Sequence, residues 1–373
     1  MSNSMLLAID GRPANETRRV GIGNYCFEVV RALAALPGAP RLRIYLDAPP
    51  VPGFPVDGGN ADIRVLPACR GWTHRAMGSD LRRDPADVFF SAGLQIPAFC
   101  SVPRVATVHD LAYITFPEHF TAVNRVANRV YARYALGRAA HLIAVSEATK
   151  QDAMRLFGVP ESRITVALEG ASAQYHGAIP QADQNRVRDK LGLHAPYVLY
   201  VGALQPRKNL ARLMEAFATV IARRPDLPHE LVIAGGKGWL YDSIFAAAEA
   251  SPAKARIRFL DYVPGGDLPA LMAGADVLAL VSLWEGFGLP VLEAMACGTA
   301  VLTSNCSSLP EVAGDAGVLV DPYDVAAIAA GLESLMSDES RRKACVERGF
   351  QRAQEFTWEK TAQSVLGAVR SLV

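Results

Sequence analysis

Several features that mark other protein classes are missing from this 373-residue sequence. No apolar run approaches the roughly 20 residues that a membrane-spanning helix needs. The 38 lysines and arginines are balanced by 37 aspartates and glutamates, so the strongly basic face of a nucleic-acid binder is not indicated. The six cysteines are scattered without a Cys-x-x-Cys pair, which favours reduced thiols over a disulfide framework or zinc site. We therefore expect a cytoplasmic protein with no nucleic-acid partner.

Motifs for metals and bound cofactors are also lacking. The sequence contains no Asp-x-Asp and no His-x-x-x-His spacing, so no metal site is predicted. Gly21-Ile-Gly23 does not complete a Gly-x-Gly-x-x-Gly dinucleotide fingerprint, because Cys26 occupies the last position. Gly235-Gly-Lys237 lacks the upstream glycine spacing and the following Ser or Thr of a phosphate-binding P-loop. The sequence thus predicts no cofactor beyond a co-substrate.

Short β-branched runs alternate with helical patterns along the whole chain, which is typical of parallel α/β sheets. The polar stretch 171–184 interrupts this alternation and predicts two doubly wound, Rossmann-like domains. We expect an N-terminal domain over 1–178, a linker over 179–190, a C-terminal domain over 191–355 and a terminal helix over 356–373 that crosses back to the first domain. Ligands of such sheets bind at the carboxyl ends of the strands, so two facing sheets would enclose a cleft. The predicted strands are 6–9, 42–46, 63–66, 87–91, 105–108, 141–145, 164–167, 197–201, 231–234, 257–260, 277–281, 300–303 and 317–320.

The most informative segment is Glu285-Gly-Phe-Gly-Leu-Pro-Val-Leu-Glu293, which follows the predicted strand 277–281. Its glycines permit a tight turn, and a proline in second position favours a helix starting near Leu289. The free N–H groups and dipole of that helix start would bind a diphosphate. Glu285 would lie near a donor sugar, and Glu293, placed in the first helical turn, near a ribose. An ordinary strand–turn–helix junction with two solvated glutamates is the alternative. The expected donor-binding residues here are Gly286, Phe287, Gly288, Leu289 and Glu293.

Two further strand ends carry candidate residues. Arg207 and Lys208 follow the strand 197–201 across a turn containing Gly202, where two cations could neutralise a diphosphate leaving group. Taken alone, such a pair is more often a solvated surface feature. His109 ends the strand 105–108, a position that faces a ligand-binding edge more often than a core.

These segments together resemble the family 4 retaining glycosyltransferases of the GT-B fold. Glu285 to Glu293 is similar to the family's E-x7-E motif, and the stretches 197–210, 294–305 and 309–322 continue the likeness, as do 107–111 and 145–150 in the first half. The resemblance implies that Arg207 and Lys208 bind the donor phosphates and that His109 aligns the transferred sugar. It also implies that backbone groups at Val263 contact the nucleobase and that the loop with Gly21 and Gly23 closes over the donor phosphate. Glu169 departs from the pattern, because family members commonly carry asparagine there.

The stretches 108–118 and 231–240 look most like mannosyltransferases of bacterial O-antigen and related surface polysaccharides. The likeness implies mannose transfer from GDP-mannose to a saccharide or lipid-linked saccharide, with a UDP-sugar donor as the alternative. A nucleotide-sugar epimerase and a non-catalytic saccharide-binding protein are rival interpretations. Arg125, Arg129 and Arg133 recur every four residues between valines; they form either a solvated helix face or a peripheral contact with the inner face of the cell membrane.

Overall fold

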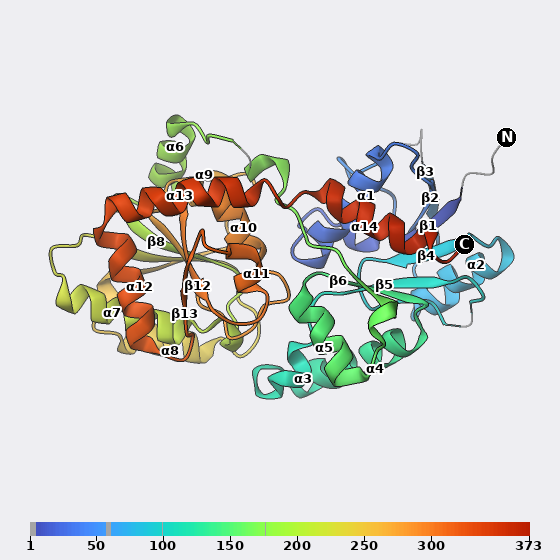
Figure 1. The fold of residues 1–373 in the computed structure, drawn as a ribbon, viewed down its shortest axis with the longest axis horizontal. Coiled ribbons are helices and arrows are strands. Elements are labelled where there is room, and N and C mark those ends of the chain that lie inside the picture. Colours follow the sequence, from blue (N-terminus) through green and yellow to red (C-terminus); the bar gives the residue numbers. More distant parts are fainter. Residues whose placement is uncertain (1–4, 57–60, 99, 176) are drawn as a thin grey trace. The chain divides into compact units, whose positions relative to one another are not determined.

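The computed structural model describes residues 5–56, 61–98, 100–175 and 177–373. Within these ranges the chain forms two units, each built on a parallel sheet that carries helices on both faces (Figure 1). The first unit comprises Met1–Leu111, Val126–Glu169 and Thr357–Val373, and the second comprises Ala112–Arg125 and Gly170–Phe356. In the described part of the chain, no helix has both the length and the apolarity needed to cross a bilayer.

The sheet of the first unit has the strand order β3-β2-β1-β4-β5-β6-β7, so the order reverses between β1 and β4. The inner strand β1 is apolar on both faces, with Leu7, Ala8 and Ile9 fully buried, as expected where helices cover both sides. The strands are β1 (Leu6–Asp10), β2 (Arg41–Leu46), β3 (Ala61–Val65), β4 (Val88–Ser91), β5 (Arg104–Val108), β6 (His141–Ala144) and β7 (Ile164–Val166). The helices of this half are α1 (Ile22–Ala35), α2 (Gly78–Arg83), α3 (Ala112–Thr115), α4 (Ala122–Arg138) and α5 (Glu147–Phe157).

The sheet of the second unit has the order β10-β9-β8-β11-β12-β13 and reverses between β8 and β11. Helix α7 shows why its helices pack on this sheet: Leu210, Leu213, Met214 and Phe217 recur at helical spacing and are all buried. The strands are β8 (Tyr197–Val201), β9 (Glu230–Ala234), β10 (Ile257–Asp261), β11 (Val277–Leu280), β12 (Ala300–Ser304) and β13 (Val318–Val320). The helices are α6 (Gln181–Leu191), α7 (Leu210–Arg223), α8 (Asp242–Ala250), α9 (Leu268–Ala273), α10 (Leu289–Ala296), α11 (Leu309–Ala313), α12 (Val325–Ser337) and α13 (Glu339–Ala353).

Every predicted strand is present, with ends shifted by at most two residues. The stretch expected to be a linker differs, because most of it forms α6. This helix packs on α9 and is tied to it by Lys190 and Arg186, whose cations lie 2.7 and 3.1 Å from the Asp267 carboxylate. The polar stretch therefore forms an ordered helix that buries Val187 and carries partly exposed ion pairs to Asp267.

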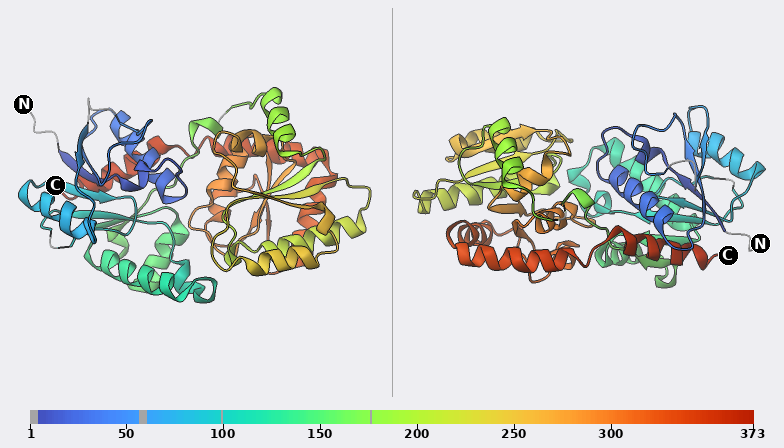
Figure 2. Two further views of the ribbon diagram at one scale, coloured as in Figure 1. Left: turned by 180° about the vertical axis from the view of Figure 1, so that it is seen from behind. Right: turned by 90° about the horizontal axis from the view of Figure 1, so that it is seen from above.

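The last helix, α14 (Trp358–Arg370), belongs to the first unit. It lies beside α1 in all views (Figures 1 and 2), and the Thr361 hydroxyl donates to the carbonyl of Leu168 at 2.6 Å. In the other direction, residues 112–125 group with the second unit, where Trp239 Nε1 donates to the His119 carbonyl at 2.6 Å. Each unit thus includes chain from both halves of the sequence.

Candidate active site

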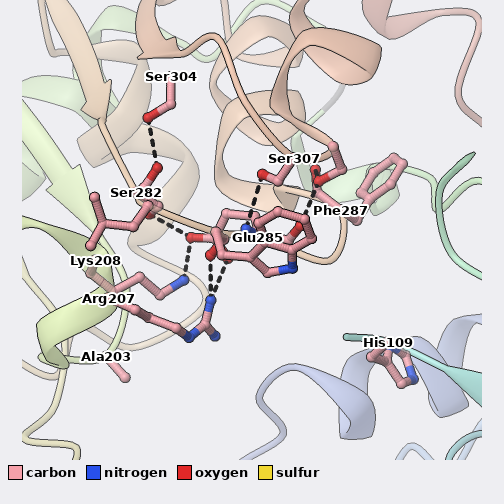
Figure 3. Close-up of polar contacts among 12 residues, drawn as sticks. His109, Ala203, Arg207, Lys208, Ser282, Glu285, Phe287, Ser304 and Ser307 are labelled. Atoms are coloured by element: carbon pink, nitrogen blue, oxygen red, sulfur yellow. Dashed lines mark hydrogen bonds and ion pairs between the residues drawn. The ribbon is translucent and has the colours of Figure 1, made fainter. Parts of the chain in front are cut away.

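A charged cluster occupies the point where the strand order of the second sheet reverses. Arg207 and Lys208 follow β8, Glu285 follows β11, and these strands are neighbours, so their carboxyl ends place the three side chains together. Lys208 Nζ lies 2.5 Å from Glu285 Oε1, and Arg207 Nη1 lies 3.2 Å from Oε2. Figure 3 shows the Glu285 carboxylate between these two cations and Ser282. The structure thus brings Glu285 together with Arg207 and Lys208, which precede it by almost eighty positions in the sequence.

Three serines that the sequence analysis did not single out hold the side chain and backbone around Glu285. Ser282 Oγ donates to Glu285 Oε1 at 2.6 Å, and the backbone N–H of Glu285 donates to Ser307 Oγ at 3.1 Å (Figure 3). Ser308 Oγ reaches the carbonyls of Glu285 and Phe287 at 3.0 and 2.7 Å. Ser282 could have been noticed, since it directly follows an apolar strand and precedes the motif. Ser307 and Ser308 come from the loop after β12, which only the fold brings close.

Asn209 anchors the segment that carries the two cations. Its backbone is left-handed (φ 61°), and its Nδ2 donates to the carbonyls of Val281 and Pro322 at 3.0 and 2.7 Å. The N–H of Leu283 donates to the Arg207 carbonyl at 2.9 Å, which joins the two loops directly. The asparagine follows Arg207 and Lys208 in the sequence and was not predicted to matter.

The electrostatics keep Glu285 ionised. Its side chain is only 8% exposed, and burial by itself would raise the pKa of the carboxyl group. The charges of Lys208 and Arg207, with hydrogen bonds from Lys208 and Ser282, outweigh burial and lower the pKa to about 2. The three side chains together carry one net positive charge, so the cluster can still attract an anion.

The turn after Glu285 leads into α10 as expected. Gly288 adopts φ 109°, and a Cβ there would lie 2.8 Å from Leu309 Cδ2, so the position requires glycine. The helix starts at Leu289, which confirms the predicted start. One expectation was wrong: Glu293 is the fifth residue of α10, and a turn of 3.6 residues that starts at Leu289 ends before it. Glu293 instead lies near Tyr175, whose pKa is raised by burial and then by this carboxylate.

The other predicted donor-binding residues of the second unit lie around the same sheet edge. Gly202 follows β8, and its N–H donates to the Ala234 carbonyl at 3.0 Å. Gly286 and the buried Phe287 lie in the turn before α10, and Phe287 packs edge-on against Phe356 with ring centroids 5.9 Å apart. Val263 is buried after β10, the edge strand of the sheet. The roles given to these residues stay predictions.

The remaining predicted residues belong to the first unit. His109 follows β5; its Nε2 lies 2.8 Å from the Ala92 carbonyl and its Nδ1 lies 3.4 Å from Glu169 Oε1. Burial lowers the pKa of His109, but the hydrogen bond and charge of Glu169 and the Ala92 carbonyl raise it, and the net shift is upward. Glu169, the residue that departs from the family pattern, therefore takes part in the environment of this histidine.

Gly21 and Gly23 of the first unit do not both lie in a loop before the helix, as the sequence predicted. Helix α1 begins at Ile22, two residues earlier than the predicted start near Asn24, so Gly23 lies inside the helix. Gly21 caps it with φ 47°, and a Cβ on Gly23 would lie 2.9 Å from the Pro13 carbonyl. Among the residues that the structure describes, no group of three or more His, Cys, Asp or Glu side chains could hold a metal ion.

Comparison with known proteins places these features in a family. Residues 20–174 match the model "Glycosyltransferase Family 4", and residues 183–352 match "Glycosyl transferases group 1". The O-antigen chain mannosyltransferase B of Escherichia coli is 31% identical, with 94% of this chain and 96% of that protein aligned. A D-inositol 3-phosphate glycosyltransferase of Corynebacterium glutamicum is also 31% identical, over 70% of this chain and 65% of its own length.

A solved structure shares the fold. Sucrose-phosphate synthase from Thermosynechococcus elongatus superposes with a TM-score of 0.78 at 20% identity, covering 99% of each chain. The match therefore includes both parallel-sheet units. Family models over both halves, a relative matched almost end to end and this fold lead to one conclusion: the chain belongs to the family 4 glycosyltransferases of the GT-B fold.

Proposed function

We propose that this glycosyltransferase transfers mannose from GDP-mannose, with retention at the anomeric carbon, to a saccharide or lipid-linked saccharide of a bacterial surface polysaccharide. The observation that carries the proposal is the Arg207–Lys208–Glu285 cluster at the β8/β11 reversal. The choice of mannose is supported by the relative whose name describes an O-antigen mannosyltransferase and which aligns with nearly the whole chain.

The cluster suggests how a nucleotide-sugar donor would bind. Arg207 and Lys208 are held by Glu285, so the donor diphosphate would replace the carboxylate as their partner. Glu285 would then accept hydrogen bonds from hydroxyl groups of the donor sugar. The start of α10, preceded by Gly286 and Gly288, would add its positive end to the phosphate site.

Transfer would follow from this arrangement. The bond between the anomeric carbon and the phosphate oxygen breaks while the acceptor oxygen bonds to the same face of that carbon. The acceptor proton passes to the leaving phosphate, whose negative charge Arg207 and Lys208 stabilise. These two cations and the helix start would do the work that a metal ion does elsewhere, so we propose a metal-independent reaction. His109 would orient the sugar from the first unit.

Helix α4 supports peripheral contact with a membrane. Its exposed valines Val123, Val126 and Val130 are 78%, 61% and 62% accessible, and the helix has no acidic residue. Arg125, Arg129 and Arg133 are exposed on the same helix, a composition that suits an anionic lipid surface. Flotation with vesicles containing phosphatidylglycerol should recover the protein, and vesicles of phosphatidylcholine alone should not.

A nucleotide panel tests the donor. GDP and GDP-mannose should raise the melting temperature, with or without magnesium, more than UDP, ADP or their sugars do. Incubation with GDP-mannose and a mannoside acceptor should release GDP, and NMR should show an α-linked product, the configuration of the donor. A preference for UDP would overturn the donor assignment. Conversion of the donor sugar without an acceptor would indicate an epimerase, and absence of turnover would indicate a binding protein.

A further inference from the structure

Helix α10 is contacted by the chain just after it leaves the first unit. The chain leaves that unit after Glu169, and Ala173–Tyr175 forms a short 3₁₀ helix of the second unit. This short helix packs on α10, and the Cys297 thiol donates to the Tyr175 carbonyl at 3.6 Å. The place of Tyr175 is thus fixed by the same helix that carries Glu293.

The Tyr175 ring lies beside the Glu293 carboxylate. Glu293 and Cys297 are four positions apart and therefore share one face of the helix. With its carbonyl held at Cys297, Tyr175 hydrogen-bonds through its hydroxyl to Glu293, one turn earlier. The side chain of Gln174 hydrogen-bonds to the same hydroxyl. A chain of hydrogen bonds therefore runs from the crossing segment to Glu293.

Burial and charge keep this contact in one protonation state. Tyr175 is only 4% exposed, and burial, followed by the charge of Glu293, raises the pKa of its hydroxyl. Burial and the same carboxylate also raise the pKa of the Cys297 thiol to about 12. Both groups stay protonated at neutral pH, so the phenol donates its hydrogen and the carboxylate accepts it.

A hydrogen bond from a fixed ring prepares Glu293 for a ligand. Glutamate has several rotatable side-chain bonds, and ordering such a side chain on binding costs free energy. Glu293 is half-buried, and Tyr175 restrains it before a ligand arrives. An ionised carboxylate offers about four acceptor sites, of which the tyrosine uses one. The others can accept from neighbouring hydroxyl groups, such as those of a ribose.

We propose that Tyr175 is a positioning residue for the donor: its hydroxyl holds the Glu293 carboxylate in the orientation that accepts hydrogen bonds from the 2′ and 3′ hydroxyls of the nucleotide ribose. Tyr175 itself does not touch the nucleotide. This role rests on the proposed binding of a nucleotide-sugar donor and on the ribose contact expected of Glu293. It adds the residue that orients this contact.

Calorimetry with GDP and 2′,3′-dideoxy-GDP, which lacks both hydroxyls, tests this role. The wild type should bind GDP about tenfold more tightly than the dideoxy nucleotide. Tyr175→Phe keeps the ring and should weaken GDP binding about fivefold without changing the dideoxy affinity, since only the hydrogen bond to Glu293 is lost. Tyr197→Phe is the matched control, because it also removes a buried hydroxyl, which donates to the Leu271 carbonyl at 2.7 Å at the start of β8. It should change neither affinity.

A double-mutant cycle separates positioning from packing. Glu293→Ala should abolish the preference for GDP, and adding Tyr175→Phe should then weaken GDP binding no further. Thermal unfolding would establish that each variant is folded at the assay temperature. Additive losses, equal losses for both nucleotides in Tyr175→Phe, or unchanged GDP binding in that variant would overturn the positioning role and leave the proposed function intact.

The wild type alone tests the premises of the proposal. Equal affinities for GDP and its dideoxy form would refute the ribose contact and, with it, the role of Tyr175. If GDP does not bind, the donor assignment fails, and the same comparison with UDP and 2′,3′-dideoxy-UDP decides the role of Tyr175. Failure of both GDP and UDP to bind would overturn both proposals.

Discussion

The two sheets of this enzyme reverse their strand order at equivalent places. Both reversal points hold a carboxylate paired with an arginine, but their net charges differ. Each holds a buried carboxylate and an arginine: Asp10 with Arg12 between β1 and β4, and Glu285 with Arg207 between β8 and β11. In the first unit the pair is complete and neutral, whereas Lys208 adds a second cation in the second unit.

That one additional lysine gives the two edges different net charges. The second reversal point keeps a net positive charge and suits a diphosphate, even though Glu285 occupies the cations in the absence of donor. The first is neutral and leads into a cavity with aromatic walls. Few residues thus give two equivalent sheet edges a different charge and a different lining.

Glu285→Gln should have the largest effect. The amide keeps the size of the side chain but removes the charge that faces Lys208 and Arg207, so kcat/KM should fall about 10³-fold. Circular dichroism and thermal unfolding would establish that the variant is folded at the assay temperature. Glu339→Gln, on the exposed start of α13, is the matched control and should retain activity. Near-normal turnover by Glu285→Gln would remove this residue from the mechanism.

Replacing the carboxylate of the first unit by an amide should lower the stability of the fold. Asp10→Asn leaves the Arg12 guanidinium without its charged partner and should lower the free energy of unfolding by about 2 kcal/mol. The affinity for GDP, measured by calorimetry below the melting temperature, should not change, because the donor cluster is in the second unit. Weaker GDP binding would show that the two reversal points are not independent.

The smallest effect concerns the pH dependence of His109. Glu169→Gln removes the charge that, with the Ala92 carbonyl, raises the pKa of His109 against the effect of burial. The pKa from an NMR titration of the ring should therefore fall. Because the pKa is raised on folding, this interaction stabilises the protein at pH values below the pKa of an unfolded histidine. The stabilisation is lost as the pH rises through the folded pKa, and in the variant it should be lost at lower pH. Asp110 and Tyr25 remain near the ring in both proteins, and an unchanged titration would contradict the role of Glu169.

Local patterns were sufficient for the strands and for the start of α10, because apolar runs and the glycine–proline turn act over a few residues. They failed where distant contacts matter: the polar stretch of α6 packs on α9, with Val187 buried and Asp267 paired with Arg186 and Lys190. The serines around Glu285 and the Asn209 anchor were missed for the same reason, since Ser307 comes from the loop after a different strand.

The sequence by itself determined the doubly wound architecture, the family and the residue types of the Arg207–Lys208–Glu285 cluster, all of which are encoded in periodicity and short motifs. Only the tertiary structure decided that Glu285 is held between Lys208 and Arg207 and that Glu169 faces His109. It also formed the cavity beside Arg12 from four strand ends and α4. The physical reason is that strands neighbouring in a parallel sheet are far apart in the chain, so the contacts between their carboxyl ends leave no local pattern to read.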